Sequence, residues 1–445
     1  MPASHDLRDL LHAEVTQLRE EGCNTETLVS ELACIEQSLE RQAVSLYEAA
    51  WLQASELKPE PGSAYEEPST LDEIRAARPP GPRRLVDPGE DLEDRLLGAW
   101  LGRCAGCMLG KPVEGRTKAQ IDALLAAAGE EALTDYFPPI PHAPASLHWH
   151  APDNPMLRGN ITHGVRDDDT DYTVIGLHYL EENGPNFTSQ DVANQWQQHL
   201  PFHLVYTAER VAYRNLVNGL KPPESASFRN PYREWIGAQI RCDAFGYAAP
   251  GWPEKAAEFA FRDAAVSHTK NGIYGEMFFA ALIAAALVVD SLDEALEAAL
   301  AEIPAKSRLR EAMLETRRFC SEEDDWQNAW ERINAAYGHY HPVHTINNAA
   351  LVLMGLLYGA REPDPALQYE RSITLAVHGG WDTDCNGATA GSVAGALLGA
   401  RQLPGKWTSV LNDRLESIVV GLTDNRISDL AKRTMNVAKK VIAEA

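Results

Sequence analysis

The chain has 445 residues, of which 44% are hydrophobic and 23% charged, and its 40 basic and 64 acidic side chains give a net charge of −24 at pH 7. This is the composition of a globular protein, and its excess of acid argues against general nucleic-acid binding and against anionic membranes, which need clustered Lys and Arg. Seven scattered cysteines form no disulfide framework, and the longest apolar run, 277–289, is shorter than the ~20 residues of a membrane helix, so we expect a soluble cytoplasmic protein.

Residues 1–57 are predicted to form an N-terminal helical hairpin. Apolar residues recur at three- and four-residue spacing over 7–18 and again over 28–39, and a glycine-containing turn at 21–24 interrupts the pattern. This spacing is typical of two amphipathic helices. Their apolar face must be buried against the main body or against another copy of the chain, so self-association through the hairpin is one of two arrangements that we consider.

Residues 58–90 are predicted to be a proline-rich linker with one short helix. Seven prolines lie in this segment, and proline at such density prevents long regular structure. Within it, Ser69–Asp72 resembles a helix capping box, and Arg78–Pro80 would end the short helix that follows. The main domain, 91–445, is expected to begin near Asp91.

The main domain is predicted to be all-α, because nearly every periodic segment in it has helical spacing and strand alternation is almost absent. Two stretches, 129–166 and 217–250, are long, polar and irregular. Long loops inside a compact domain are usually functional, so we expect the functional site where they meet the helices. The predicted helices span 92–109, 170–181, 191–199, 253–266, 273–289, 292–302, 307–320, 325–337, 346–358, 365–377, 387–398 and 427–443.

The strongest signal for chemistry is the acidic run at 166–171, Arg-Asp-Asp-Asp-Thr-Asp, which directly precedes an apolar helical segment. One aspartate at that place would be explained as a helix cap, which contributes ~0.3–1 kcal/mol. Four carboxylates in five positions exceed what a cap requires. Hard cations prefer oxygen ligands, so Asp167, Asp168 and Asp169 are candidate metal ligands, with a solvated helix N-terminus as the alternative.

A second acidic segment, 379–387, has the sequence Gly-Gly-Trp-Asp-Thr-Asp-Cys-Asn-Gly and also precedes a predicted helix. That helix is rich in alanine and glycine, which allows close helix packing and indicates a buried position. Capping with a tight glycine turn would again be the simpler interpretation. However, Asp382 and Asp384 occupy the same structural place as the first run, and this parallel predicts one divalent-metal site shared by both segments.

These residues resemble a known family. The segment 91–114, with Asp-Leu-Glu-Asp-Arg-Leu-Leu-Gly-Ala-Trp-Leu-Gly at its start and Leu-Gly-Lys-Pro-Val-Glu at its end, resembles the opening of the ADP-ribosylglycohydrolase family, of the dinitrogenase-reductase-activating glycohydrolase type. The acidic run, Ser267-His268-Thr269 and the second acidic segment match later motifs of that family in the right order. The resemblance covers roughly residues 91–400.

The resemblance implies an all-α fold and a glycosidase that acts on ribosyl bonds with two Mg²⁺ or Mn²⁺ ions. Its substrate would be an ADP-ribosylated protein or a small ribosylated molecule. The implied residues are Asp168 and Asp169 as the first ligand pair, Asp382 and Asp384 as the second, Glu114 as a mobile acid near the metals, His268 as a substrate-lining residue, and Gly237 to Arg241 as a phosphate-binding loop. To these we add Asp167 as a fifth ligand. The general base would be Glu114 or one of the metal-held carboxylates, Asp168 and Asp169.

Two positions depart from the family pattern. Asp167 and Cys385 stand where the family commonly has threonine. An extra carboxylate adds negative charge to one metal position, whereas a thiol is a poor ligand for Mg²⁺. The acceptor atom and the number of metal ions therefore remain open at this point.

Two further groups of residues have weaker signals. Cys104 and Cys107 form a lone pair of cysteines in a helical segment, and we interpret them as buried thiols, because no second pair completes a zinc site. Histidines at 339, 341 and 344 precede Asn347. This cluster is interpreted as a zinc site, as ordinary surface, or as a loop that lines the sugar or base pocket, in which Asn347 would bind substrate.

Three functional hypotheses follow. The first is a metal-dependent hydrolase of ADP-ribosyl linkages. The second is a hydrolase of a smaller riboside, such as a nucleoside or a ribosyl phosphate, which would use the same metals. These two differ in whether the 217–250 segment binds a pyrophosphate, for which Arg229, Arg233 and Arg241 would be suited. The third is a protein that binds ADP-ribose without cleaving it.

Overall fold

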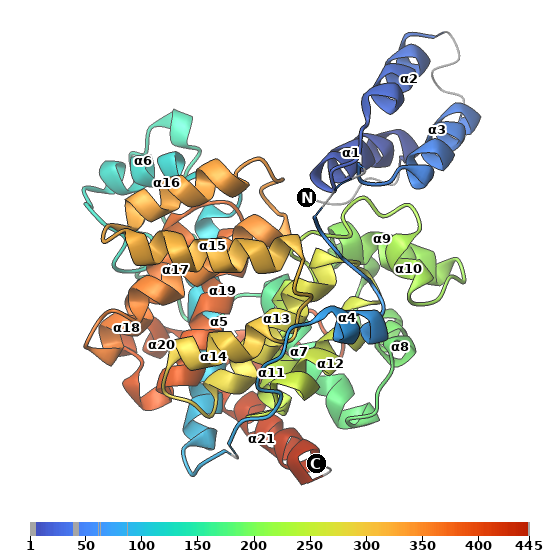
Figure 1. Cartoon of the computed structure of the whole chain (residues 1–445). Coiled ribbons are helices and arrows are strands. Elements are labelled where there is room, and N and C mark those ends of the chain that lie inside the picture. The colour runs from blue at the N-terminus through green and yellow to red at the C-terminus, as the bar shows by residue number, and fades with distance from the viewer. Residues whose placement is uncertain (1–5, 39–43, 61, 63, 87, 444–445) are drawn as a thin grey trace.

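A computed structural model of the chain describes residues 6–38, 44–60, 62, 64–86 and 88–443. Within these residues it has 21 α-helices and one two-stranded sheet, so the prediction of an all-α fold is confirmed (Figure 1). The strands β1 (Arg414–Glu416) and β2 (Asp424–Arg426) pair antiparallel, with Leu415 opposite Asn425. A helix of the length and apolar character that a membrane span requires is absent from the described part of the chain.

The N-terminal segment has three helices in its described part, where the sequence predicts two. They are α1 (Leu7–Glu20), α2 (Glu26–Gln37) and α3 (Val44–Glu56), and Gly22 makes the predicted turn with a φ of +81°. The third helix lies outside the predicted pair. Its buried residues, Tyr47, Ala50 and Ala54, have helical spacing, but two of them are alanines, which give a weak apolar signal. The three helices share a hydrophobic core of their own and extend outward from the main domain (Figure 1).

The helix α1 also packs against the main domain. Leu10 is fully buried there against α9 (Thr207–Val217). Beside it, the Arg233 guanidinium forms ion pairs with Glu14 at 2.7 Å and with Glu21 at 2.6 Å. Of the two arrangements considered for the hairpin, burial of one face against the main body is therefore present within a single chain.

The linker is bonded along the surface of the main domain. It contains the predicted short helix, α4 (Leu71–Ala77), although the Thr70 hydroxyl donates to the Glu73 carboxylate rather than capping the backbone. On either side of α4, Glu66 N donates to Lys306 O at 2.9 Å and Leu85 N donates to Gly251 O at 2.8 Å. Ion pairs from Arg78 and Arg83 to the buried Glu302 reinforce this attachment.

The main-domain helices agree with the predicted segments to within a few residues at most ends. Five described helices lie outside the predicted ones: the longer α6 (Lys118–Ala128) and α9, and the short α10 (Glu224–Ser227), α11 (Asp243–Ala248) and α20 (Gly405–Thr408). The irregular stretch 129–166 contains no α-helix, whereas 217–250 contains two short ones. The remaining helices are α5 (Leu92–Gly110), α7 (Asp168–Asn183), α8 (Ser189–His199), α12 (Pro253–Ala264), α13 (Asn271–Ala286), α14 (Leu292–Leu300), α15 (Arg308–Glu322), α16 (Trp326–Tyr337), α17 (Thr345–Gly359), α18 (Pro365–His378), α19 (Thr383–Leu398) and α21 (Ile427–Ala443).

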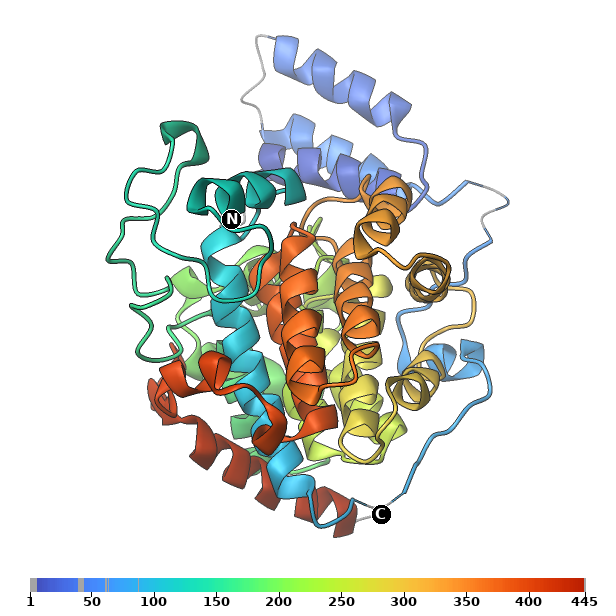
Figure 2. The same ribbon diagram turned by 90° about the vertical axis from the view of Figure 1, so that its left-hand side faces the viewer.

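The helices α5 and α19 lie side by side and antiparallel near the middle of the domain (Figure 2). They touch through glycines. A Cβ added at Gly391 would lie 2.8 Å from the carbonyl carbon of Gly102, and one added at Gly106 would lie 2.5 Å from that of Gly387. Side chains are therefore excluded from this contact, and the two backbones meet directly.

This contact fixes the ends of the two helices relative to each other. The Thr383 hydroxyl, at the first residue of α19, donates to the carbonyl oxygen of Gly110, the last residue of α5, at 2.8 Å. Because Glu114 follows α5 closely and Asp382 and Asp384 begin α19, the glycine contact brings these three acids to one place.

Candidate metal centre

The two acidic segments meet where the N-termini of α7 and α19 face the C-terminal end of α5. In the described residues, three groups place their potential metal-ligand atoms within 4.8 Å of one another. Neighbouring groups share a residue, so they form one continuous centre. The groups are Glu114, Asp382 and Asp384; Asp169, Asp384 and Cys385; and Cys107, Asp167 and Asp169.

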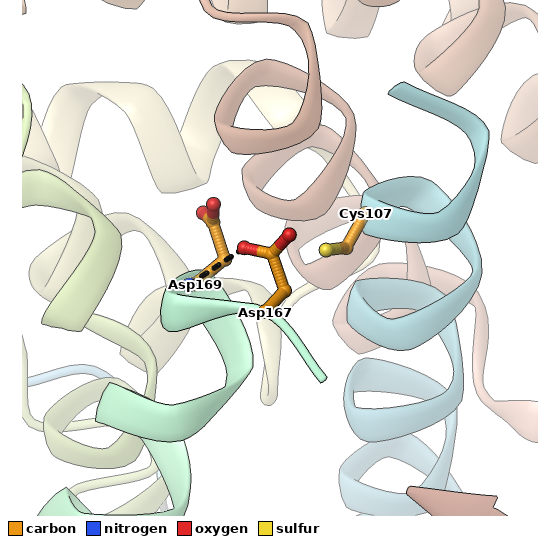
Figure 3. Close-up of side chains that lie close together, drawn as sticks. All are labelled: Cys107, Asp167 and Asp169. Atoms are coloured by element: carbon orange, nitrogen blue, oxygen red, sulfur yellow. Dashed lines mark hydrogen bonds between the residues drawn. The ribbon is translucent and has the colours of Figure 1, made fainter. Parts of the chain in front are cut away.

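The first acidic run supplies both a helix cap and candidate ligands. Asp167 is the N-cap of α7, and its Oδ1 accepts a hydrogen bond from Asp169 N at 3.0 Å. Its other oxygen forms an ion pair with the Lys111 ammonium. Asp169 is 1% exposed, and its Oδ2 accepts a hydrogen bond from Cys385 Sγ at 3.3 Å. Figure 3 shows the Asp167 carboxylate, just before α7, lying between Asp169 and the thiol of Cys107 on α5.

The other two acids of the run are placed differently. Asp168 is half-buried and belongs to none of the three groups found in the described residues. Asp171 forms an ion pair with Arg166 at 2.7 Å and accepts a hydrogen bond from Ile418 N at 2.8 Å. Asp171 thus connects α7 to the C-terminal part of the chain.

The second acidic segment is held by a side chain from α17. Asp382 N and Asn386 Nδ2 both donate to Asn348 Oδ1, at 3.1 and 2.9 Å. Asp382 occupies the N-cap position of α19, but its carboxylate makes no capping hydrogen bond. The helix begins at Thr383, four residues before the predicted start, so that Asp384 lies in its first turn. The Asp382 carboxylate is therefore not needed as a helix cap.

Burial and mutual repulsion dominate the electrostatics of the centre. Burial raises the pKa values of Asp168, Asp169 and Asp384 well above their ordinary range, and repulsion from Asp167 raises them further. Burial acts on Asp167 in the same direction, but the Lys111 ammonium outweighs it, so the pKa of Asp167 lies below its usual value. The guanidinium groups of Arg166, near Asp168, and Arg103, near Asp169, act in the opposite direction but do not outweigh burial.

The donor set fits a divalent cation. Asp169 Oδ1 is buried and has no hydrogen-bond partner in the described structure, since Arg103 Nη2 lies 3.6 Å away. A buried acceptor without a partner is costly, and a bound cation would satisfy it. Carboxylate oxygens are also the ligands that hard divalent ions prefer.

Glu114 lies at the solvent side of the centre, directly after a short 3₁₀ turn at Lys111–Val113. Desolvation by the surrounding protein, followed by repulsion from Asp382 and Asp167, raises its pKa to about 7, although part of the side chain remains exposed. An acid with this pKa can take up and release a proton near neutral pH.

Comparison with known proteins identifies the family. A family model described as ADP-ribosylglycohydrolase matches residues 88–441. The chain belongs to the ADP-ribosylglycohydrolase family. A solved structure titled "ADP-ribosylglycohydrolase-related protein complex" is similar at 20% sequence identity, with 79% of this chain and 99% of that chain covered and a TM-score of 0.45. A search of the curated proteins finds no match.

Family membership implies a glycosidase whose substrates are ADP-ribosyl compounds. The family match leaves out residues 1–87, which hold the three N-terminal helices and most of the linker. The residues of the candidate metal centre all lie inside the matched region.

Arg241, expected in a phosphate-binding loop, is buried among carboxylates. Its Nη1 donates to Glu209 Oε1 at 2.6 Å and to Gly237 O at 2.9 Å, and its Nε pairs with Asp263. Glu276 lies 3.6 Å from its Nη2. A guanidinium in this setting neutralises buried acids, and this placement does not fit the expected binding of a substrate phosphate.

Two other residues expected at the substrate also have internal partners. Asn347 Nδ2 donates to His341 O at 3.1 Å, and its oxygen accepts from Asn348 N at 3.0 Å. His268 is buried, with Nδ1 at 2.8 Å from the Ser267 hydroxyl, while its Nε2 has no hydrogen-bond partner in the described structure. Roles for Gly237, His268 and Asn347 in substrate binding stay predictions.

The histidine cluster has structural contacts. His341 stacks on Trp235 with ring centroids 4.0 Å apart, and His344 Nδ1 accepts a hydrogen bond from Ile346 N as the N-cap of α17. Neither histidine, nor His339, belongs to a group with metal-ligand spacing in the described residues. The zinc interpretation of this cluster therefore has no support here.

Sequence reasoning missed three residues of the centre: Lys111, Cys107 and Asn348. Cys107 and Lys111 are four residues apart at the end of α5, and this one-turn spacing was the available signal that both face the same side. Asn348 directly follows Asn347, the residue that the sequence suggested as a substrate ligand. Its contact with Asp382 depends on how α17 packs, which no local pattern encodes.

Proposed function

We propose that this chain is a divalent-metal-dependent hydrolase that cleaves the bond between ribose C1 and the acceptor atom of an ADP-ribosylated substrate. Either a modified protein or a small ribosylated molecule would serve as substrate. One observation carries this proposal: carboxylates from two segments far apart in the sequence converge with Glu114 in a mostly buried centre. Family membership supports the reaction class.

The residues proposed to hold metal are Asp167, Asp168, Asp169, Asp382 and Asp384, with two Mg²⁺ or Mn²⁺ ions as the expected cofactors. When bound, such ions supply Lewis acidity and an attachment point for the vicinal ribose hydroxyls. The Asp167–Lys111 ion pair would limit the negative charge on one side of the centre. Asn348 keeps Asp382 in place through its backbone N–H.

Glu114 is proposed as the general base. Its partial exposure lets water reach the carboxylate, and a pKa of about 7 suits proton abstraction from the attacking water at neutral pH. Asp168, whose raised pKa includes repulsion from Glu114, is the alternative proton acceptor. Cleavage at C1 builds positive charge on the ribose ring, and the surrounding carboxylates would stabilise that charge.

A second candidate function is hydrolysis of a smaller riboside, and one observation favours it. The three arginines suited to a pyrophosphate are all paired with carboxylates: Arg229 with Glu48 at 3.4 Å, Arg233 with Glu14 and Glu21, and Arg241 with Glu209. A substrate without a pyrophosphate would not need them.

Calorimetry on chelator-treated full-length protein tests the proposal. Mg²⁺ or Mn²⁺ should bind, and ADP-ribose should bind only with metal present; release of ADP-ribose from modified proteins then identifies the acceptor. Asp384→Asn should abolish metal binding and turnover, whereas Asp171→Asn, in the same fold but outside the centre, should retain metal binding. Metal-dependent binding of nucleosides or ribose 5-phosphate alone would support the smaller-riboside hydrolase.

Two outcomes would contradict the proposed hydrolase. Metal-dependent binding of ADP-ribose without release from any modified substrate would indicate a binding protein. If no divalent ion binds, both acidic segments would be interpreted as helix caps.

A further inference from the structure

We propose that Cys385 makes the metal centre asymmetric. One position, formed by Glu114, Asp382 and Asp384, offers only oxygen and suits Mg²⁺. The other, between Asp169, Asp384 and Cys385, binds a thiophilic ion such as Zn²⁺, Co²⁺ or Cd²⁺ in preference to Mg²⁺. This inference rests on the divalent-metal centre of the proposed function and specifies its ion preference.

The position of the thiol carries the inference. Ligand atoms of Cys385, Asp169 and Asp384 lie within 4.8 Å of one another, and Cys385 is 6% exposed. The thiol donates its hydrogen to Asp169 Oδ2 at 3.3 Å, so the sulfur already faces the carboxylate with which it would share an ion. A cysteine placed only for packing would not need to face a buried acid.

A second observation points to a cation at the same place. The other oxygen of Asp169, Oδ1, is buried and accepts no hydrogen bond in the described structure, because the Arg103 guanidinium lies 3.6 Å away, at ion-pair distance only. An ion held by this carboxylate and by the Cys385 sulfur would give Oδ1 a direct partner. The S–H proton would pass to solvent as the sulfur–metal bond forms.

A second thiol, Cys107, lies near Asp167 and Asp169 and provides a matched control (Figure 3). It is 1% exposed and also borders the centre. However, the Lys111 ammonium already pairs with Asp167, so a positive charge occupies the side of the centre that Cys107 faces. We therefore assign the sulfur ligand to Cys385 and not to Cys107.

Ligand chemistry gives the expected ion preference. Thiolates select borderline and soft ions, whereas carboxylate-only sites suit Mg²⁺ and Mn²⁺. Serine at position 385 would keep the size of the side chain nearly constant and replace sulfur by a hard oxygen. Loss of a residue that only hydrogen-bonds to a metal ligand lowers metal affinity roughly 10-fold. Loss of the sulfur ligand itself should therefore lower the Cd²⁺ affinity by more than about 10-fold.

The test titrates Cd²⁺ and Co²⁺ into chelator-treated full-length protein and follows sulfur-to-metal charge-transfer absorption, which a site without sulfur ligands does not show. The native chain and Cys107→Ser should develop the band, and Cys385→Ser should not. Calorimetry should show Cd²⁺ affinity reduced by more than about 10-fold in Cys385→Ser, with a much smaller change for Mg²⁺. Retained Mg²⁺ binding establishes that this variant is folded.

Four results would overturn the inference. If Mg²⁺ binds but the native chain shows no band, or if Cys385→Ser keeps it, the thiol is not a ligand and the metal-dependent hydrolase still stands. A band lost only in Cys107→Ser would place the sulfur ligand on α5. If the native chain binds no divalent ion, the proposed function itself fails and this inference fails with it.

Discussion

The glycine contact between α5 and α19 leads to a sharp prediction for Gly391→Ala. An added Cβ would overlap the Gly102 carbonyl oxygen and would also lie 2.8 Å from the carbonyl carbon, about 0.7 Å inside the ~3.5 Å of an ordinary carbon contact. The obstacle is helical backbone, which cannot rotate away as a side chain can. The helices must therefore separate or tilt along their whole contact.

Two opposing contributions determine the size of the effect. Alanine is favoured over glycine inside a helix by ~1 kcal/mol. Overpacking of a well-packed interior by one methyl group costs ~1–3 kcal/mol, and rigid backbone on both sides places this contact at the upper end. We therefore expect Gly391→Ala to lower the free energy of unfolding by about 2 kcal/mol net.

The position of the substituted glycine along the α5–α19 contact should decide whether metal binding is weakened together with the stability of the fold. Gly110→Ala would place its Cβ 2.5 Å from Asp384 N, directly at the metal centre, whereas Gly395→Ala would crowd Gly98 at the far end of the contact. Both should destabilise the fold, but Gly110→Ala should weaken Mg²⁺ binding far more. Urea unfolding followed by circular dichroism measures the first effect, and calorimetry measures the second.

Gly405→Ala in α20 is the control, because its added Cβ would meet only the Ser409 hydroxyl, at 3.2 Å. It should leave the unfolding midpoint nearly unchanged. If Gly391→Ala unfolds at the same urea concentration as Gly405→Ala, the helices do not touch through backbone and the reasoning is refuted.

Three further predictions concern charge. Mg²⁺ or Mn²⁺ at 100 times its Kd should stabilise the native chain by about 2.7 kcal/mol, which raises its melting temperature. The Asp384→Asn variant should show no such rise. Equal rises in the native chain and in this variant would contradict the assigned ligands. Lys111→Met should lower stability without metal and strengthen divalent binding, because Asp167 loses its cation; weaker binding by calorimetry would show that Lys111 orders the site instead. Glu20, whose pKa burial raises to about 7, holds a proton in the native state that the unfolded chain releases, so stability should fall as pH rises through about 7. The urea unfolding midpoints at about pH 5.5 and pH 8 should differ less in Glu20→Gln than in the native chain. If the two proteins show the same difference, the pH dependence of stability comes from other groups.

The helices of the main domain could be predicted largely from apolar spacing, but particular elements show the limits. The helix α6 has a local signal, a capping box in which Thr117 and Gln120 exchange hydrogen bonds. The helix α9 has no capping side chain, and its packing surface includes Leu10 from the N-terminal segment. Helix α19 starts earlier than predicted because tertiary contacts, including the Thr383 bond to α5, hold its first turn.

The convergence of the two acidic segments could be anticipated because both begin helices, yet the sequence could not say which acids face inward. Asp169 and Asp171 are two residues apart in one run, but Arg166 and the backbone at Ile418 draw Asp171 away from the centre. The partners of Arg241 likewise come from helices distant in sequence. Such contacts depend on tertiary packing, which local pattern does not contain.

The attachment of the linker affects how the N-terminal helices could exchange between molecules. Because Glu66 is already bonded to Lys306, only a short stretch of chain separates α3 from a fixed point on the main domain. Undocked α1 would thus face its own docking surface at an effective concentration on the order of millimolar. A second copy at cellular concentration could not compete, so helix swapping is disfavoured, and any association of copies through this segment would use the outward faces of α2 and α3 (Figure 1).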